Sequence, residues 1–177
     1  MKALLDACVL YPTVLREVLL GAARTGLYEP LWSARILEEW ARAAAKLGAG
    51  QEALARGEIA LTRSGFPRAE VKENKALEQR LWLPDAGDVH VLAAAISGHA
   101  ELIVTFNAQD FPRGLLAEEG LGRSGPDEFL LGLDRAGVAA VAEAVRAEAE
   151  RLSGVPQPLR ALMKRAGLPR LGKALAD

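Results

Sequence analysis

The sequence is poor in the residue types on which several common kinds of site depend. Its single cysteine, Cys8, excludes an internal disulfide and suits a reducing compartment. The two histidines, His90 and His99, lack the spacing of a zinc site, and there is no serine–histidine or cysteine–histidine pair and no glycine-rich phosphate loop. The formal net charge is −1, so no overall basic field indicates a nucleic-acid-binding protein.

Long apolar segments are missing as well. No apolar run is long enough to cross a bilayer, and the N-terminal segment reaches Asp6 without the apolar stretch of a signal peptide. Half of the 177 residues are nevertheless hydrophobic, which suits one domain with a sizeable core. We therefore expect an intracellular, cytoplasmic domain that makes no contact with a membrane.

The centre of the chain has the pattern of an α/β fold. Residues 84–98 predict a helix with an acid, Asp88, near its start. Its apolar face comprises Val89, Leu92, Ala93 and Ile96. Residues 101–105 predict a short buried strand, and the polar loop that follows carries Asn107 and Asp110. Because ligands of α/β folds gather outside the carboxyl ends of strands, this segment predicts part of an active site.

A second acid, Asp6, directly follows a strand predicted at residues 3–5. A carboxylate beside a buried apolar run is costly unless it is solvated, paired or bound to a cation, so a solvated strand end remains an alternative. Asp85 and Asp88 also suit any helix N-terminus, and Asp110 suits an ordinary turn. Each acid taken alone therefore leaves a purely structural role open.

Two helices are predicted between these acidic segments. The first covers residues 12–24 and carries Arg16 near its start, where the guanidinium either pairs with an acid or a phosphate or lies solvated. Ser33 is a suitable cap for the second. Its buried stripe comprises Ile36, Leu37, Trp40, Ala41 and Ala44. Glu38 and Glu39 lie on opposite flanks of that stripe, so periodicity does not choose between them.

The remaining segments carry no chemistry that their residues identify. One helix is expected on each side of a break at residues 64–67. The C-terminal part is expected to be mostly helical, with an interruption at Gly137. The last helix is expected to stop at Gly167 and Pro169. Further short elements are a connection or strand at 27–32, a helix and turn over 114–125 with a strand near Leu121, and a proline-containing linker at 156–158. The basic residues of 151–177 either contact a phosphate backbone, lie solvated or face another subunit.

Together, the polar residues at strand ends and helix flanks indicate a metal site. They are Asp6, one of Glu38 and Glu39, Asp88, and Asn107 or Asp110. Carboxylates without soft ligands suit hard cations such as Mg²⁺ or Mn²⁺, and a cation relieves their mutual repulsion. A site of this kind activates water and stabilises the leaving oxygen in phosphodiester hydrolysis.

Four motifs, in order and separation, resemble the PIN domain family of metal-dependent ribonucleases, which includes the VapC-type toxins of bacterial toxin–antitoxin pairs. The motifs are LLDACVLYP (4–12), Ser33-x-x-Ile-Leu-x-Glu39, PDAGDVHVLAAA (84–95) and VTFNAQDFP (104–112). The C-terminal segments PDEFLLGL (126–133) and AGLPRL (166–171) resemble one bacterial subgroup. The resemblance implies an α/β/α sandwich with a mostly parallel sheet. It places a nuclease domain at 1–125 and a helical extension, packed on the same domain, at 126–177.

Carried over by position, the first three family acids fall on Asp6, Glu39 and Asp88. The fourth falls on Asn107, where the family usually has an aspartate, and Asp110 stands three residues later. We expect Asn107 to line the site and Asp110 to stand at its rim or support the loop, with Asp110 kept as an alternative metal ligand beside the three acids. Arg16 and Thr105 are expected to bind substrate. Ala7 and Gly87 are further departures from the family pattern.

These features favour an endoribonuclease that uses Mg²⁺ or Mn²⁺, as the toxin of a toxin–antitoxin pair. The expected partners are an RNA substrate, an antitoxin protein and further copies of the chain. The alternative is a PIN-like module that binds RNA or protein without cutting, which Ala7, Gly87 and Asn107 favour. A carboxylate–Mg²⁺ phosphatase fits less well, because no second aspartate follows Asp6 two residues later.

Overall fold

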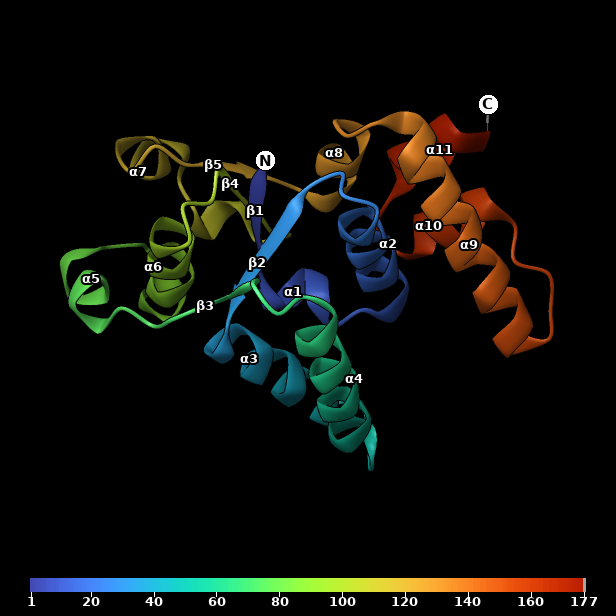
Figure 1. The fold of residues 1–177 in the computed structure, drawn as a ribbon, viewed down its shortest axis with the longest axis horizontal. Helices are drawn as coiled ribbons and strands as arrows, with labels where there is room; N and C mark the ends of the chain where they lie inside the picture. Colours follow the sequence, from blue (N-terminus) through green and yellow to red (C-terminus); the bar gives the residue numbers. More distant parts are fainter. Residues whose placement is uncertain (177) are drawn as a thin grey trace. The chain divides into compact units, whose positions relative to one another are not determined.

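The computed structural model describes residues 1–176, which form two compact units (Figure 1). The first unit comprises Met1–Tyr11 and Glu29–Ser124, and the second comprises Pro12–Tyr28 and the described residues from Gly125 onward. All the predicted acidic positions lie in the first unit. Among residues 1–176, no helix is both long enough and apolar enough to pass through a membrane.

The first unit is built on a five-stranded sheet in the order β3-β2-β1-β4-β5. The strands are β1 (Lys2–Leu5), β2 (Glu29–Ser33), β3 (Glu70–Val71), β4 (Leu102–Val104) and β5 (Gly122–Ser124). All neighbouring pairs are parallel, so the carboxyl ends of the strands share one edge. The strand order reverses between β1 and β4, which makes the carboxyl ends of these two strands the expected place for a ligand. The predicted α/β/α fold with a parallel sheet is confirmed.

Strand β2 contains a proline, and for this reason the sequence pattern did not decide whether residues 27–32 form a connection or a strand. Backbone N–H groups alternate in direction along a strand: that of Glu29 bonds Met1 toward β1, and that of Trp32 bonds Ala69 toward β3. By this alternation the nitrogen of Pro30 faces the β3 side, where β3 pairs only with Trp32 and Ser33. Pro30 therefore removes no hydrogen bond from the sheet.

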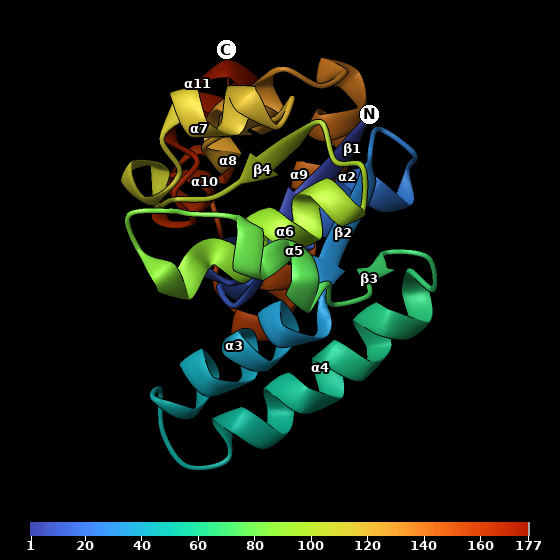
Figure 2. The same ribbon diagram turned by 90° about the vertical axis from the view of Figure 1, so that its left-hand side faces the viewer.

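Two helices follow β2, and their packing confirms the sequence pattern. Ser33 accepts a hydrogen bond from the backbone N–H of Ile36 at 3.2 Å and so caps α3 (Ala34–Ala45). The buried residues of α3 are the five of the predicted stripe. Helix α4 (Gln51–Gly65) packs along α3 (Figure 2).

Helix α6 (Val89–Ser97) packs against β1, β2 and β4 (Figure 2). The sequence predicted one continuous helix from Pro84, but a 3₁₀ turn, η1 (Ala86–Asp88), comes first, after α5 (Lys75–Arg80). Asp85 holds this turn by accepting the Gly87 N–H at 2.7 Å. The buried face is also wider than predicted, because all residues from His90 to Ala95 are buried while Val89 and Ile96 are only half-buried.

Short elements complete the first unit. Helix α1 (Ala7–Leu10) follows β1 directly and was not predicted, since four residues carry too little periodicity. The loop after β4 contains a 3₁₀ turn, η2 (Ala108–Asp110), and helix α7 (Arg113–Glu118) connects it toward β5.

The second unit is helical. It contains α2 (Thr13–Arg24), α8 (Pro126–Leu131), α9 (Arg135–Ser153), α10 (Leu159–Arg165) and α11 (Pro169–Ala176). Helices α2 and α9 approach closely at Gly21, where a Cβ atom would lie 2.5 Å from Cγ1 of Val141. The ring of Tyr28 packs edge-on against Phe129, with centroids 4.9 Å apart.

Two sequence predictions for this unit are wrong in detail. The long C-terminal helical pattern breaks before Arg135 rather than at Gly137, because Asp134 caps α9 by accepting the Gly137 N–H at 2.7 Å. Pro169 does not end the helical region but starts α11, since proline lacks an N–H that the first turn leaves unbonded in any case.

Candidate active site

The register of the sheet places Asp6 beside Thr105 at the carboxyl edge. Leu5 pairs with Val104, and the Asp6 N–H continues the ladder by donating to the Val104 carbonyl at 3.1 Å. The next residue on each strand is therefore adjacent to its counterpart. The hydroxyl of Thr105 donates to Oδ2 of Asp6 at 2.7 Å and accepts the Asn107 N–H at 3.0 Å.

Asp6 is buried, with 5% of its surface exposed, and its carboxylate is held from several directions. Oδ1 accepts the N–H of Ala7 at 2.7 Å, which makes Asp6 the cap of α1. The thiol of Cys8 lies 3.4 Å from Oδ2. These hydrogen bonds offset the cost of burying a charge, so a solvated strand end does not describe Asp6.

Asp88 lies half-buried where η1 meets α6, and its pKa is raised to about 6. Burial is the largest cause, because it disfavours the charged form. The carboxylates of Asp6, Asp85, Asp110 and Glu39 add to the shift in that order. Four further acids thus act on one carboxyl group, which is the crowding of negative charge that a cation would relieve.

The two glutamates of α3 have different surroundings. Glu39 lies 2.7 Å from Nε2 of His90, a buried residue of α6, and is among the acids that raise the pKa of Asp88. Glu38 is held by Arg56 of α4 through two hydrogen bonds of 2.9 Å. Glu39 therefore faces the acidic cluster, and Glu38 faces α4.

His90 was considered from the sequence only as a zinc ligand, and its contact with Glu39 was missed. At 2.7 Å from a carboxylate oxygen, which can only accept, Nε2 is the protonated ring nitrogen and donates a hydrogen bond. Nδ1 is buried and has no hydrogen-bond partner among the described residues. One polar residue within the apolar run VHVLAAA was the available signal, since a buried histidine needs a partner.

Cys8 is a second residue that the sequence did not place at the site. Its sulfur lies 3.4 Å from the Thr105 hydroxyl and accepts the Phe106 N–H at 3.3 Å. Burial, followed by the charge of Asp6, raises the pKa of the Cys8 thiol to about 12. The thiol therefore stays protonated at neutral pH, so it supports the Asp6 and Thr105 pair and is not a nucleophile.

The loop after β4 gives the two candidates for the fourth acidic position different surroundings. The backbone of Asn107 bonds Thr105 through its N–H and Asp110 through its carbonyl, which accepts the Asp110 N–H at 3.0 Å. Asn107 is exposed, whereas Asp110 is half-buried and contributes to the raised pKa of Asp88. The carboxylate of Asp110 thus belongs electrostatically with the other acids.

The two expected substrate contacts are both buried. The guanidinium of Arg16, in the second unit, approaches Glu17 at 3.9 Å, so the alternative of a solvated surface arginine is wrong. The hydroxyl of Thr105 is occupied by Asp6 and Asn107. Contact of either side chain with a substrate stays a prediction.

The donors around Asp88 fit a hard divalent ion in their chemistry, because they are carboxylate oxygens that repel one another. Among residues 1–176, no three histidine, cysteine or acidic side chains lie close enough together to hold an ion jointly. Mg²⁺ commonly binds through one or two carboxylates and keeps several waters, so it does not require three side chains to converge.

Comparison with known proteins gives one match. A family model described as a PIN domain matches residues 2–109, which is more than half of the 177 residues. No curated protein and no solved structure matches the chain. The matched segment runs from β1 into η2 and includes Asp6, Glu39, Asp85 and Asp88, whereas Asp110 lies one residue beyond it.

Proposed function

Because the chain belongs to the PIN domain family, whose members are generally nucleases, we propose that it is a metal-dependent endoribonuclease. The observation that carries this proposal is the buried carboxylate of Asp6, which Thr105 holds at the carboxyl edge where β1 and β4 meet. Four other carboxylates oppose the ionisation of Asp88 at the carboxyl edge of the sheet, beside the point where the strand order reverses. Such crowding is destabilising in the empty protein and favourable once a cation is bound.

The roles we propose follow the family order of the acids. Asp6 and Asp88 hold Mg²⁺ or Mn²⁺ directly, and Glu39 contributes as a ligand or through a bound water. Asp110 supplies further negative charge, and the Asn107 amide positions water or a phosphate. Bound there, the ion supplies a Lewis acid for hydrolysis of an RNA phosphodiester bond.

Three side chains of the chain position these acids. Thr105 donates to Asp6 at 2.7 Å, and the Cys8 thiol lies 3.4 Å from the same oxygen, so both fix the carboxylate. The Nε2–H of His90 donates to Oε1 of Glu39 at 2.7 Å and so orients that carboxylate. The remaining lone pairs of the carboxylate stay available for a metal ion or a water.

We further propose that the nuclease is the toxin of a toxin–antitoxin pair, in a VapC-like subgroup with a C-terminal extension at 126–177. This finer assignment rests on PDEFLLGL (126–133) and AGLPRL (166–171). It implies an antitoxin partner, a homo-oligomer and a cytoplasmic location. Arrest of growth on expression of the wild-type chain, and normal growth with Asp6→Asn, would support the toxin role.

The alternative is a PIN module that binds RNA or protein without cutting, which Ala7, Gly87 and Asn107 favour as departures from the family pattern. A cleavage assay separates the two. With Mn²⁺ and labelled single-stranded RNA, we expect the wild-type chain to cut and Asp6→Asn and Asp88→Asn to lose cleavage to background. The control is Asp134→Asn, because asparagine caps helix α9 as well as aspartate does.

Each variant must first be shown to be folded by circular dichroism. Full cleavage by folded Asp6→Asn or Asp88→Asn would refute the proposed ligands. Absence of cleavage by the folded wild-type chain, together with RNA binding, would favour the module that binds without cutting.

A further inference from the structure

The exposed aromatic side chains of the first unit have an unusual distribution. The chain has nine aromatic residues, and most are buried or half-buried, including Trp32 and Trp40. Tyr11, Trp82 and Phe106 are exposed by 38%, 67% and 46%. A large aromatic surface left in water gains the most from a ligand that covers it.

All three exposed aromatics flank the acidic segments. Tyr11 is the C-cap of helix α1, and Asp6 is its N-cap. Trp82 precedes the turn that carries Asp88, and Phe106 follows Thr105 directly. Tyr11 and Phe106 therefore follow closely after the carboxyl ends of β1 and β4 in the chain, and Trp82 lies six residues before Asp88.

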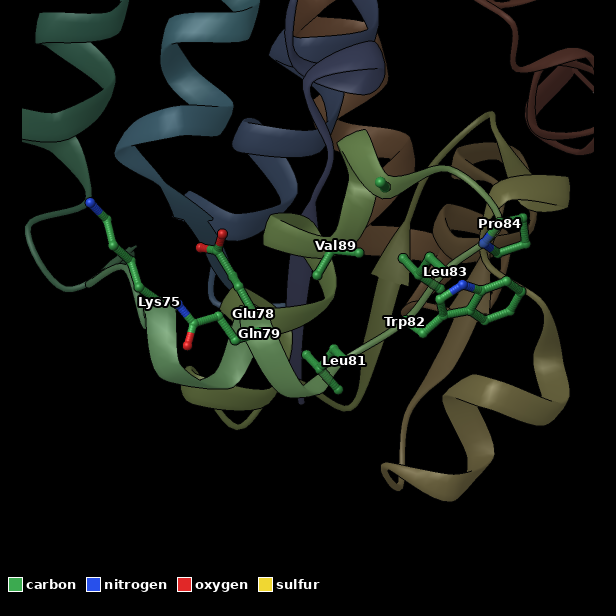
Figure 3. A pocket seen from close by; sticks show the side chains of 9 residues that line it. Lys75, Glu78, Gln79, Leu81, Trp82, Leu83, Pro84 and Val89 are labelled. Atoms are coloured by element: carbon green, nitrogen blue, oxygen red, sulfur yellow. The ribbon is translucent and has the colours of Figure 1, made fainter.

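Trp82 also borders a pocket of about 530 Å³, within the size range of small-ligand sites (Figure 3). Leu81, Leu83 and Val89 provide apolar surface, while Lys75 and Gln79 provide a cation and an amide. The pocket continues to Pro84 and Ala86, which begin the turn containing Asp88.

The charge of the pocket does not exclude a polyanion. Glu78 also lines it, but its carboxylate lies 3.9 Å from Arg35, which is equally close to Glu39. Arg35 therefore partly neutralises the negative charge of Glu78. A flat aromatic ring, an amide and one cation are the groups that bind an unpaired nucleobase and its phosphate.

We propose that Trp82 and Phe106, which lie near Asp88 and Thr105 in the sequence, form a stacking platform for unpaired bases of single-stranded RNA. The choice of RNA rests on the proposed function. Proteins that bind single strands usually attract the phosphates with a basic groove, but this chain has a net charge of −1 and a cluster of acids. Base stacking supplies the affinity that long-range attraction does not, and it selects single strands because bases in a duplex are already stacked.

The test measures binding without cleavage, in EDTA, with a fluorescein-labelled oligouridine and an abasic strand of equal length as probes. Trp82→Ala and Phe106→Ala should each weaken oligouridine binding about 10-fold, and Trp82→Phe should retain most of the affinity. Leu61→Ala is the matched control, because Leu61 is an exposed apolar residue of α4 away from the pocket. The wild-type chain should bind the abasic strand more weakly than Trp82→Ala binds oligouridine, because that variant keeps Phe106.

A second readout is the fluorescence of tryptophan. Trp32 and Trp40 are buried, so the long-wavelength emission comes from Trp82, and unlabelled oligouridine should quench it in the wild-type chain and not in Trp82→Phe. Equal affinity of the wild-type chain for both probes, or unchanged affinity in both alanine variants, would overturn the platform.

The outcomes for the platform and for the nuclease are separate. If the wild-type chain cleaves RNA and Trp82→Ala binds oligouridine normally, the platform is refuted and the proposed ribonuclease is retained. Aromatic-dependent binding by a chain that never cleaves would keep the platform and remove the nuclease. Absence of oligouridine binding by the wild-type chain would overturn the platform, whose aromatic surface would then face a protein.

Discussion

Replacement of Asp88 by asparagine should stabilise the protein at neutral pH in the absence of metal. The folded protein raises the pKa of Asp88 from its usual 3.8 to about 6, chiefly through burial and then through the charge of Asp6. Between these values the folded chain binds more protons than the unfolded chain, so this group makes stability fall as pH rises. The penalty is fully present above pH 6 and absent below pH 3.8.

The size of the effect follows from the same shift. At about 1.4 kcal/mol for each factor of ten, a pKa change from 3.8 to about 6 sets an upper limit of about 3 kcal/mol. Asp88 is only half-buried, and solvent screening reduces this to about 1 kcal/mol. For a chain of this length, the melting temperature should rise by about 3 °C.

Thermal unfolding in EDTA at pH 7.5 and at pH 4 tests this reasoning. Asp88→Asn should melt above the wild-type chain at pH 7.5, and the difference should shrink toward zero at pH 4. Added Mn²⁺ should stabilise the wild-type chain more than the variant, because binding to the folded state alone raises its melting temperature. Asp134→Asn, which leaves the acidic cluster intact, should respond to Mn²⁺ like the wild-type chain.

An equal or lower melting temperature of Asp88→Asn at pH 7.5 in EDTA would refute the idea that carboxylates crowd Asp88. A gain of the same size at both pH values would show that the substitution acts through packing or hydrogen bonding instead.

The remaining predictions concern the two glutamates of α3 and the loop after β4. Glu39→Gln should lower RNA cleavage strongly, whereas Glu38→Gln, which loses exposed pairs with Arg42 and Arg56, should change stability little and leave cleavage intact. The opposite ranking in a cleavage assay would mean that the wrong glutamate was chosen. Asn107→Asp should tighten Mn²⁺ binding, and Asp110→Asn should weaken it, because Asp110 acts on Asp88; calorimetric titration in which Asp110→Asn binds like the wild-type chain would leave Asp110 a loop-supporting role.

The sequence was most informative where one pattern ran through a whole element. Helix α3 has five apolar residues at helical spacing and a serine cap, and all five are buried as expected. The resemblance selected Glu39 over Glu38, and the contact of Glu39 with His90 agrees with that choice, although its role at the site stays a prediction.

Short elements and contacts between distant residues were less accessible. Helix α1 and strand β3 contain four and two residues, so only their tertiary partners stabilise them. Sequence patterns also do not indicate which side chains of different helices and strands contact one another. They therefore missed the Cys8 thiol beside Asp6 and left Arg16 open to a solvated position, although that side chain is buried.

The pairing of β1 with β4 has a consequence for biosynthesis. Asp6 and Thr105 are separated by 99 positions in the chain, yet one hydrogen bond joins them. A nascent chain that ends before β4 has an unpaired edge on β1, and the carboxylate of Asp6 has no hydroxyl to orient it. Because strands so far apart in the chain pair late, most of the polypeptide has been synthesised before the carboxyl ends of β1 and β4 can meet. The order of synthesis thus delays the appearance of any nuclease until the strand that completes it has emerged.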